Sequence, residues 1–129
     1  MTAAPVQLSD LPAEPGAYAL TFSVDAPLVL PIATLGDPVL DPGLYVYAGS
    51  AFGPGGIRAR VGRHLRADKK PHWHIDHLSS RAACIDVKTY PGGRECRLVA
   101  DLLASGAAVP IPGFGSSDCR DCAAHLVRL

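Results

Sequence analysis

In the stretch GLYVYAGSAFGPGGIRARVGRH, residues 43–64, a strand pattern leads through a glycine-rich turn into a helical pattern. Its first seven residues have the composition of a strand, and the glycines after them favour a flexible loop. Apolar residues then recur at i, i+4 and i+8 (Ile57, Val61 and Leu65), which predicts a helix that reaches about residue 67. A strand–turn–helix unit is therefore expected at the centre of the chain.

Further elements are expected on both sides of this unit. The patterns predict strands at 16–23, 28–35 and 82–90 and helices at 71–80 and 95–105, with a short final strand or helix after residue 109. Pro31 would place the second strand at a sheet edge or a bulge. We therefore expect one α/β (α+β) domain over residues 16–129, after a loose lead-in over 1–15. It should have a small, mostly antiparallel sheet of three to four strands flanked by about three helices.

The composition is that of a globular chain. Of the 129 residues, 48% are hydrophobic and 19% are charged, which suffices for a buried core and argues against disorder. Pro, Gly or a charge interrupts every apolar run before it reaches the length of a membrane span, so no membrane partner is expected. The N-terminus lacks the pattern of a secretion signal, and a cytoplasmic location is the default expectation.

The two halves of the chain carry opposite charge although the net charge is zero. Residues 1–57 contain acids and no Lys or Arg, whereas six basic residues fall between positions 58 and 70. These basic residues are Arg58, Arg60, Arg63, Arg66, Lys69 and Lys70. Such a cluster is either a solvated helix face or a patch that binds the phosphates of a nucleic acid.

Arg60 and His64 border the apolar stripe of the predicted helix over 57–67, whereas Arg63 and Arg66 point away from it. A guanidinium held at such a border can make paired hydrogen bonds to a phosphate. The alternative is that Arg60 pairs with an acid and His64 fills a gap in the packing.

Glu95 falls near the centre of the apolar stripe predicted for the helix over 95–105. A buried carboxylate must be neutralised, paired with a base or bound to a cation. A single Glu can hold Mg²⁺, which keeps several waters. The alternative is a glutamate at the start of the helix whose side chain turns out to solvent.

Tyr45 and Tyr47 project to the same side of the predicted strand, next to the turn. Phosphodiester cleavage needs a positioned water or phenolate, a cation on the phosphate oxygens and a metal that stabilises charge. Arg60 and Glu95 can supply the last two, and a tyrosine hydroxyl can orient the water.

These residues resemble the motifs of the GIY-YIG nuclease family. GAY at 16–18 is similar to the first motif and YAG at 47–49 to the second, with Ala in place of the branched middle residue. IRARVGRH at 57–64 resembles the helix that follows, and Glu95 matches the later metal-binding Glu. Together with HWHIDHL, REC and GFGSSDC, they resemble a compact branch of this superfamily, sometimes fused to DNA-repair glycosylases.

The resemblance implies a role for each matching residue. Tyr18 or Tyr47 would activate or place the water, and Arg60 would steady the phosphate. His64 would hydrogen-bond to water or phosphate, and Glu95 would carry Mg²⁺ or Mn²⁺.

Residues 24–42 would form an insertion between the two motif strands, because Tyr18 and Tyr47 lie farther apart than the family's usual spacing. The late Asn of the family is not recognisable, and Asp118 is a candidate to replace it. Further candidates for the cleft are Tyr45, Ser50, His74 and Asp76.

The tail sequence CRDCAAH places Cys119, Cys122 and His125 at a spacing typical of zinc ligands. A structural zinc site needs a fourth ligand, which would have to be one of the earlier histidines or cysteines. The alternative is that the cysteines are small buried thiols.

The sequence therefore predicts a single-domain, metal-dependent endonuclease that hydrolyses DNA, with a fused or associated DNA-repair protein as a possible partner. Arg58, Arg63, Arg66, Lys69 and Lys70 would contact the nucleic acid. The alternatives are a nucleic-acid-binding module without catalysis and a zinc-stabilised protein-interaction domain.

Overall fold

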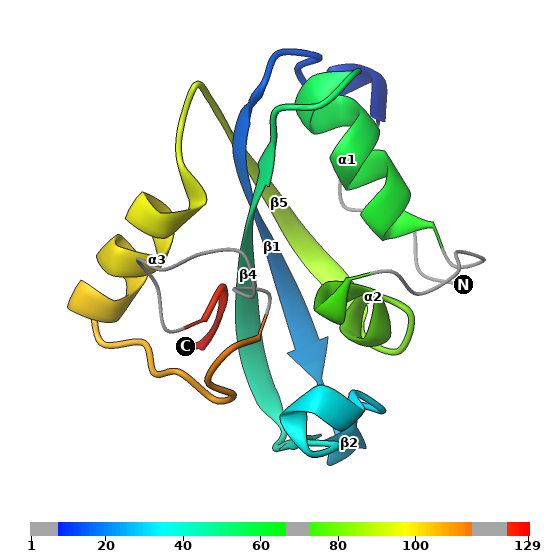
Figure 1. Cartoon of the computed structure of the whole chain (residues 1–129), viewed down its shortest axis with the longest axis vertical. Coiled ribbons are helices and arrows are strands. Elements are labelled where there is room, and N and C mark those ends of the chain that lie inside the picture. Colours follow the sequence, from blue (N-terminus) through cyan, green and yellow to red (C-terminus); the bar gives the residue numbers. More distant parts are fainter. Residues whose placement is uncertain (1–7, 67–72, 115–123) are drawn as a thin grey trace.

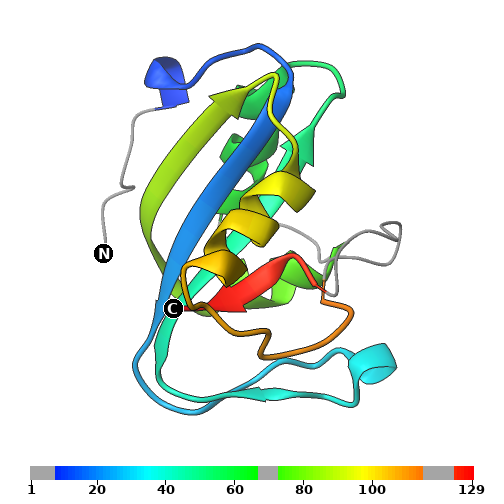
Figure 2. The same ribbon diagram turned by 90° about the vertical axis from the view of Figure 1, so that its left-hand side faces the viewer.

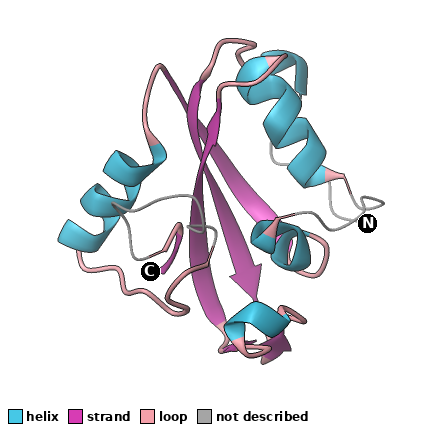
Figure 3. Ribbon diagram, viewed as in Figure 1, coloured by secondary structure: helices cyan, strands magenta, loops and turns pink. Residues whose placement is uncertain are grey.

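A twisted four-stranded antiparallel sheet forms the centre of the molecule (Figures 1 and 3). The computed structural model describes residues 8–66, 73–114 and 124–129. The strands are β1 (Gly16–Val24), β4 (Gly43–Ala51), β5 (Ala83–Pro91) and β6 (Leu126–Arg128), in the order β5-β1-β4-β6. The predicted α+β class, with its small antiparallel sheet and three helices, is confirmed.

The helices cover the two faces of this sheet unequally. Helices α1 (Gly56–Leu65) and α2 (His74–Ser79) lie on one face and α3 (Glu95–Ala104) on the other (Figures 1 and 2). Because side chains alternate along a strand, Tyr18 and Tyr47 pack with α1 and α2, whereas Ala19 and Val46 pack with α3. Small residues toward α3 and aromatic residues toward α1 place the phenols of β1 and β4 beside the helix that carries the arginines.

The predicted insertion over 24–42 forms a small separate sheet. Strand β2 (Leu28–Val29) pairs with β3 (Val39–Leu40), and a short 3₁₀ turn over Ala33–Leu35 lies between them. The longer strand expected over 28–35 was wrong, because it stops two residues before Pro31, which has no N–H to donate.

Two helices differ in detail from the prediction. The helix expected to begin at Pro71 begins as α2 at His74. In α3 the expected apolar stripe is narrower, because Val99 is buried and Leu98 and Leu102 are partly buried, whereas Leu103 is exposed.

The residues before β1 are attached to the start of α1. This segment begins with a 3₁₀ turn, η1 (Leu8–Asp10). After the turn, the carbonyl oxygen of Pro12 accepts a hydrogen bond from the N–H of Arg58, and that of Glu14 accepts one from the N–H of Ile57. These bonds use N–H groups of the first turn that would otherwise be open to an anion. None of the described helices is long and apolar enough to cross a membrane.

Gly49, the last residue of the YAG motif, lies directly opposite Tyr18 in the register of β1 and β4. A Cβ atom at Gly49 would overlap the ring and hydroxyl of Tyr18. The glycine therefore makes room for the phenol of the neighbouring strand.

Replacing Gly49 with alanine should destabilise the protein by about 1–3 kcal/mol, because the Tyr18 ring must move to admit the methyl group. The measurement is urea unfolding, with Gly53→Ala as the matched control. At Gly53 a Cβ would approach only the Arg60 side chain, 4.0 Å away. Equal losses of stability in the two variants would contradict the steric role of Gly49.

Candidate active site

A buried hydrogen bond joins β1 to α1 at the centre of the site. The Tyr18 hydroxyl lies 2.6 Å from Nε2 of His64, and both side chains are about 1% exposed. Burial raises the pKa of Tyr18 well above its ordinary value and lowers the pKa of His64, although the nearby Asp76 carboxylate partly opposes the shift at His64. At neutral pH a phenol therefore donates to a neutral imidazole.

Asp76 completes this chain of polar groups from α2. Its Oδ1 lies 3.8 Å from Nδ1 of His64, which favours the tautomer with its proton on Nδ1 and leaves Nε2 as the acceptor. The carboxylate is fully buried and accepts two bonds from Arg63, at 2.8 and 3.0 Å, and one from the backbone N–H of Trp73. Asp76, expected to line the cleft, instead lies beneath it and orients the imidazole.

Tyr47 lies beside this pair, with its ring centre 6.4 Å from that of Tyr18 and 6.1 Å from that of His64. Burial raises the pKa of Tyr47 to about 12, the positive charge of Arg60 lowers it, and the carboxylates of Asp76 and Glu95 raise it further. Tyr47 is therefore a phenol at neutral pH, and the Glu95 carboxylate lies within electrostatic reach of it.

Arg60 presents a positive charge at the open side of the site. Its guanidinium donates to the carbonyl oxygen of Ser50 at 3.3 Å and is partly exposed. It lines a pocket of about 100 Å³ together with the glycine-rich loop over 53–56. Within the described ranges it has no carboxylate partner, so the alternative in which Arg60 pairs with an acid finds no support there.

Trp73 packs against the core and also belongs to the site. The guanidinium carbons of Arg60 and Arg63 lie 4.6 and 4.4 Å from its ring centre, and its ring meets His64 edge to face. The indole thus holds both arginine planes in place. The sequence signal that could have identified Trp73 as a site residue is its position between two histidines, shortly after the basic cluster.

The basic cluster does not form one uniform patch. Arg58 donates to the backbone carbonyls of Leu11 and Ser9, so its side chain fastens the segment before β1. Arg63, expected to point away to solvent, forms the buried ion pair with Asp76. Arg66 is exposed at the end of α1, and Lys69 and Lys70 lie outside the described residues.

The remaining cleft candidates are spread over the domain. The Tyr45 hydroxyl donates to the carbonyl oxygen of Asp41, next to the start of β4, although its ring shares the face of Tyr47. Ser50 contributes its carbonyl to Arg60, and His74 packs on the ring of Phe114. Asp118 lies outside the described residues.

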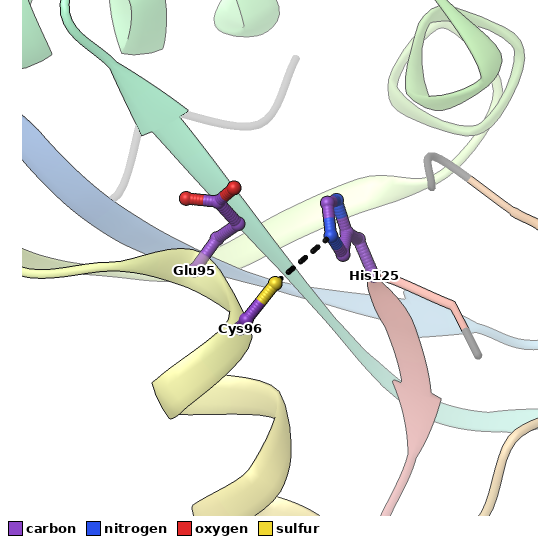
Figure 4. Close-up of side chains that lie close together, drawn as sticks. All are labelled: Glu95, Cys96 and His125. Carbon is purple, nitrogen blue, oxygen red and sulfur yellow. Dashed lines mark hydrogen bonds between the residues drawn. The ribbon is translucent and has the colours of Figure 1, made fainter. Parts of the chain in front are cut away.

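Glu95 lies at the first turn of α3 beside Cys96, and His125 comes from the segment just before β6 (Figure 4). One ligand atom from each of the three residues lies within 4.8 Å of the others. Glu95 is partly exposed and forms no ion pair with another described residue, so it is neither fully buried nor neutralised by a base. The predicted zinc ligands Cys119 and Cys122 lie outside the described residues, and Cys96 is one of the earlier cysteines among which the fourth ligand was expected.

Burial of His64 should make stability depend on pH. Because its pKa is lowered in the folded protein, the unfolded chain takes up the proton first, and stability falls as the pH drops below the ordinary value of about 6.5. One such group contributes a slope of at most about 1.4 kcal/mol per pH unit. In His64→Gln this contribution should vanish.

The measurement is urea unfolding between pH 5 and pH 7, a range set by the ordinary histidine pKa of about 6.5. His77→Gln, which changes a partly exposed histidine of α2, is the control. An unchanged slope in His64→Gln would show that His64 is not the group responsible.

Comparison with known proteins gives one family match. The family described as Domain of unknown function DUF123 matches residues 17–129. No curated protein and no solved structure matches the chain.

Proposed function

The chain belongs to the DUF123 family, and we propose that it is a divalent-metal-dependent endonuclease that hydrolyses DNA phosphodiester bonds, in DNA repair or processing. The resemblance of its motifs to GIY-YIG nucleases led to this hypothesis. A fused or associated DNA-repair protein, as well as the cytoplasmic location, stays a prediction from the sequence.

The observation that carries the proposal is the position of Arg60. Its guanidinium has no acidic partner among the described residues, lines an open pocket, and lies close enough to Tyr18 and Tyr47 to influence the pKa of both phenols. A fixed, uncompensated cation beside polarised hydroxyl groups is what a phosphate ester in a transition state requires. Trp73 limits the motion of the guanidinium and offers a ring face next to it.

The polar chain behind Arg60 can move a proton. A water bound to the Tyr18 oxygen would lose its proton to that oxygen as the phenolic proton passes to Nε2 of His64. The imidazolium that results is stabilised by the Asp76 carboxylate, 3.8 Å from Nδ1. Attack of the hydroxide on phosphorus would break the bond to the leaving oxygen, which takes a proton back.

Glu95 fits the metal in this scheme. Its partly exposed carboxylate is not held by a described cation, and Mg²⁺ binds through one or two carboxylates while keeping several waters. Bound there, Mg²⁺ or Mn²⁺ would supply stabilisation of negative charge on the phosphate and the leaving group.

One observation favours the alternative, a nucleic-acid-binding module without catalysis. Tyr18 as a whole is about 1% exposed, so a substrate reaches its hydroxyl only if the surrounding side chains move. Arg60 and the pocket, in contrast, are open to a phosphate as they stand.

Two arginines of α1 provide the decisive comparison. We expect the wild-type protein to nick plasmid or branched DNA in the presence of Mg²⁺, and Arg60→Ala to lower the rate by roughly 10²–10³-fold, as the loss of one charge-stabilising donor does. Arg58→Ala should lower stability, because Arg58 holds backbone carbonyls, and leave the rate per folded molecule nearly unchanged. Equal effects on cleavage in the two variants would contradict the assigned role of Arg60.

The second experiment separates catalysis from binding. Tyr18→Phe and Glu95→Gln should abolish Mg²⁺-dependent nicking while leaving salt-sensitive DNA affinity in place, because neither side chain carries the phosphate contact. A wild-type protein that binds DNA through Arg60 and never cuts it would support the binding module and reject the nuclease.

A further inference from the structure

The N-terminus of α3 and the segment before β6 bring a carboxylate, a sulfur and an imidazole together, and the carboxylate is close enough to Tyr47 to raise its pKa. We infer that Glu95, Cys96 and His125 form a binding site for a zinc-class divalent cation when Cys96 is in its reduced form. This site shares Glu95 with the proposed Mg²⁺ site, but its other two ligands belong to a different chemical class, and its existence does not depend on nuclease activity.

The distances fit a single ion. Sγ of Cys96 lies 3.9 Å from Nε2 of His125, the pair joined by the dashed line in Figure 4. Two tetrahedral ligands of zinc, with bonds of about 2.3 Å to sulfur and about 2.0 Å to nitrogen, lie about 3.6 Å apart. The sulfur and the nitrogen therefore need to approach by only a few tenths of an ångström to share an ion.

The third ligand requires a larger but ordinary adjustment. All three ligand atoms lie within 4.8 Å of one another, and Glu95 is partly exposed, so its side chain has room to turn. His125, in contrast, is 7% exposed, and its backbone is fixed by bonds to Ala48 and Phe114. The imidazole is thus preorganised, and the carboxylate closes onto the ion.

The donor set selects the metal. A thiolate and an imidazole are ligands typical of zinc and other late transition metals, whereas Mg²⁺ takes oxygen ligands. Three protein ligands leave a fourth tetrahedral position for water or a further group. Glu95 is the only group in this site that the proposed Mg²⁺ site also uses. Binding of Zn²⁺ and Co²⁺, measured directly, therefore distinguishes this site from the nuclease, whereas DNA cleavage does not.

The site depends on the redox state of Cys96, which is disulfide-bonded in this structure, whereas Cys84 is a free thiol. A phosphine reduces the disulfide to two thiols by two electrons, with water supplying the two protons and the oxygen of the phosphine oxide; a dithiol does the same as it becomes a disulfide. The Cys96 thiol then loses its proton as the sulfur binds the cation. Metal uptake therefore requires reduction and releases a proton.

A bound ion would also join two elements that are far apart in the sequence, α3 and the segment before β6. Strand β6 is three residues long and pairs with β4 only at Tyr45, Val46 and Tyr47. A cation held by α3 and by the residue before β6 would fix this edge of the sheet. Because the ion binds the folded form, it should raise the melting temperature of the reduced protein.

The test uses Co²⁺ as a spectroscopic probe and Zn²⁺ for stoichiometry, on the full chain kept reduced with a phosphine under anaerobic conditions. We expect one Zn²⁺ per chain after dialysis, and a thiolate-to-cobalt charge-transfer band on Co²⁺ addition. Cys96→Ser and His125→Gln should each weaken Zn²⁺ affinity by more than about 100-fold, beyond the loss that outer-shell partners cause. Glu95→Gln should weaken it less.

The matched control is Cys84→Ser, which removes a thiol on β5 outside this cluster and should leave the cobalt band and the zinc stoichiometry unchanged. His125→Gln keeps the Cys96 thiol, so its effect on metal binding is separate from the effect of removing the sulfur ligand. Absence of Zn²⁺ binding by the reduced wild type, or a cobalt band that survives both Cys96→Ser and His125→Gln, would overturn the site.

Discussion

The buried chain from Asp76 through His64 to Tyr18 is the constraint on which the site depends. Each of its members comes from a different element, α2, α1 and β1, so the chain fixes the distance between the helices and the sheet. Polar groups this deeply buried are tolerated only when each finds a partner. Arg63 satisfies the carboxylate, and Gly49 leaves space for the phenol. The geometry offered to a phosphate is therefore a consequence of how the polar core is satisfied.

One helix gives its arginines different physical roles, and the difference arises from their neighbours. Arg58 meets backbone carbonyls and Arg63 meets a buried carboxylate, whereas Arg60 meets a carbonyl oxygen, the Tyr18 hydroxyl and the Trp73 ring. When a guanidinium is paired with a carboxylate, the negative charge offsets most of the attraction that the guanidinium could exert on an anionic ligand. The charge of Arg60 is the one that no described carboxylate offsets beside the pocket, although the three arginines of α1 look alike in the sequence.

The proposed nuclease site and the proposed zinc site adjoin at Tyr47 and share Glu95. The phenols and His64 occupy the face of the sheet covered by α1 and α2, and the Glu95, Cys96 and His125 cluster lies where α3 meets the start of β6. Tyr47 connects them, because its pKa responds to Arg60 on one side and to Glu95 on the other. An ion on Glu95 would change the electrostatic environment of the phenol.

Local patterns in the sequence predicted most of the helices and strands, because the periodicity of each depends on residues that are neighbours in the chain. They located five of the elements within one or two residues at each end and placed Arg60 and His64 at the border of an apolar stripe. The partners of those residues come from segments distant in the chain. That Arg63 is neutralised by Asp76, that Trp73 lies between two guanidinium groups, and that Cys96 approaches His125 were decided only by the tertiary structure. Pairing of this kind depends on how elements pack across the sheet, and residue spacing along the chain carries no information about it.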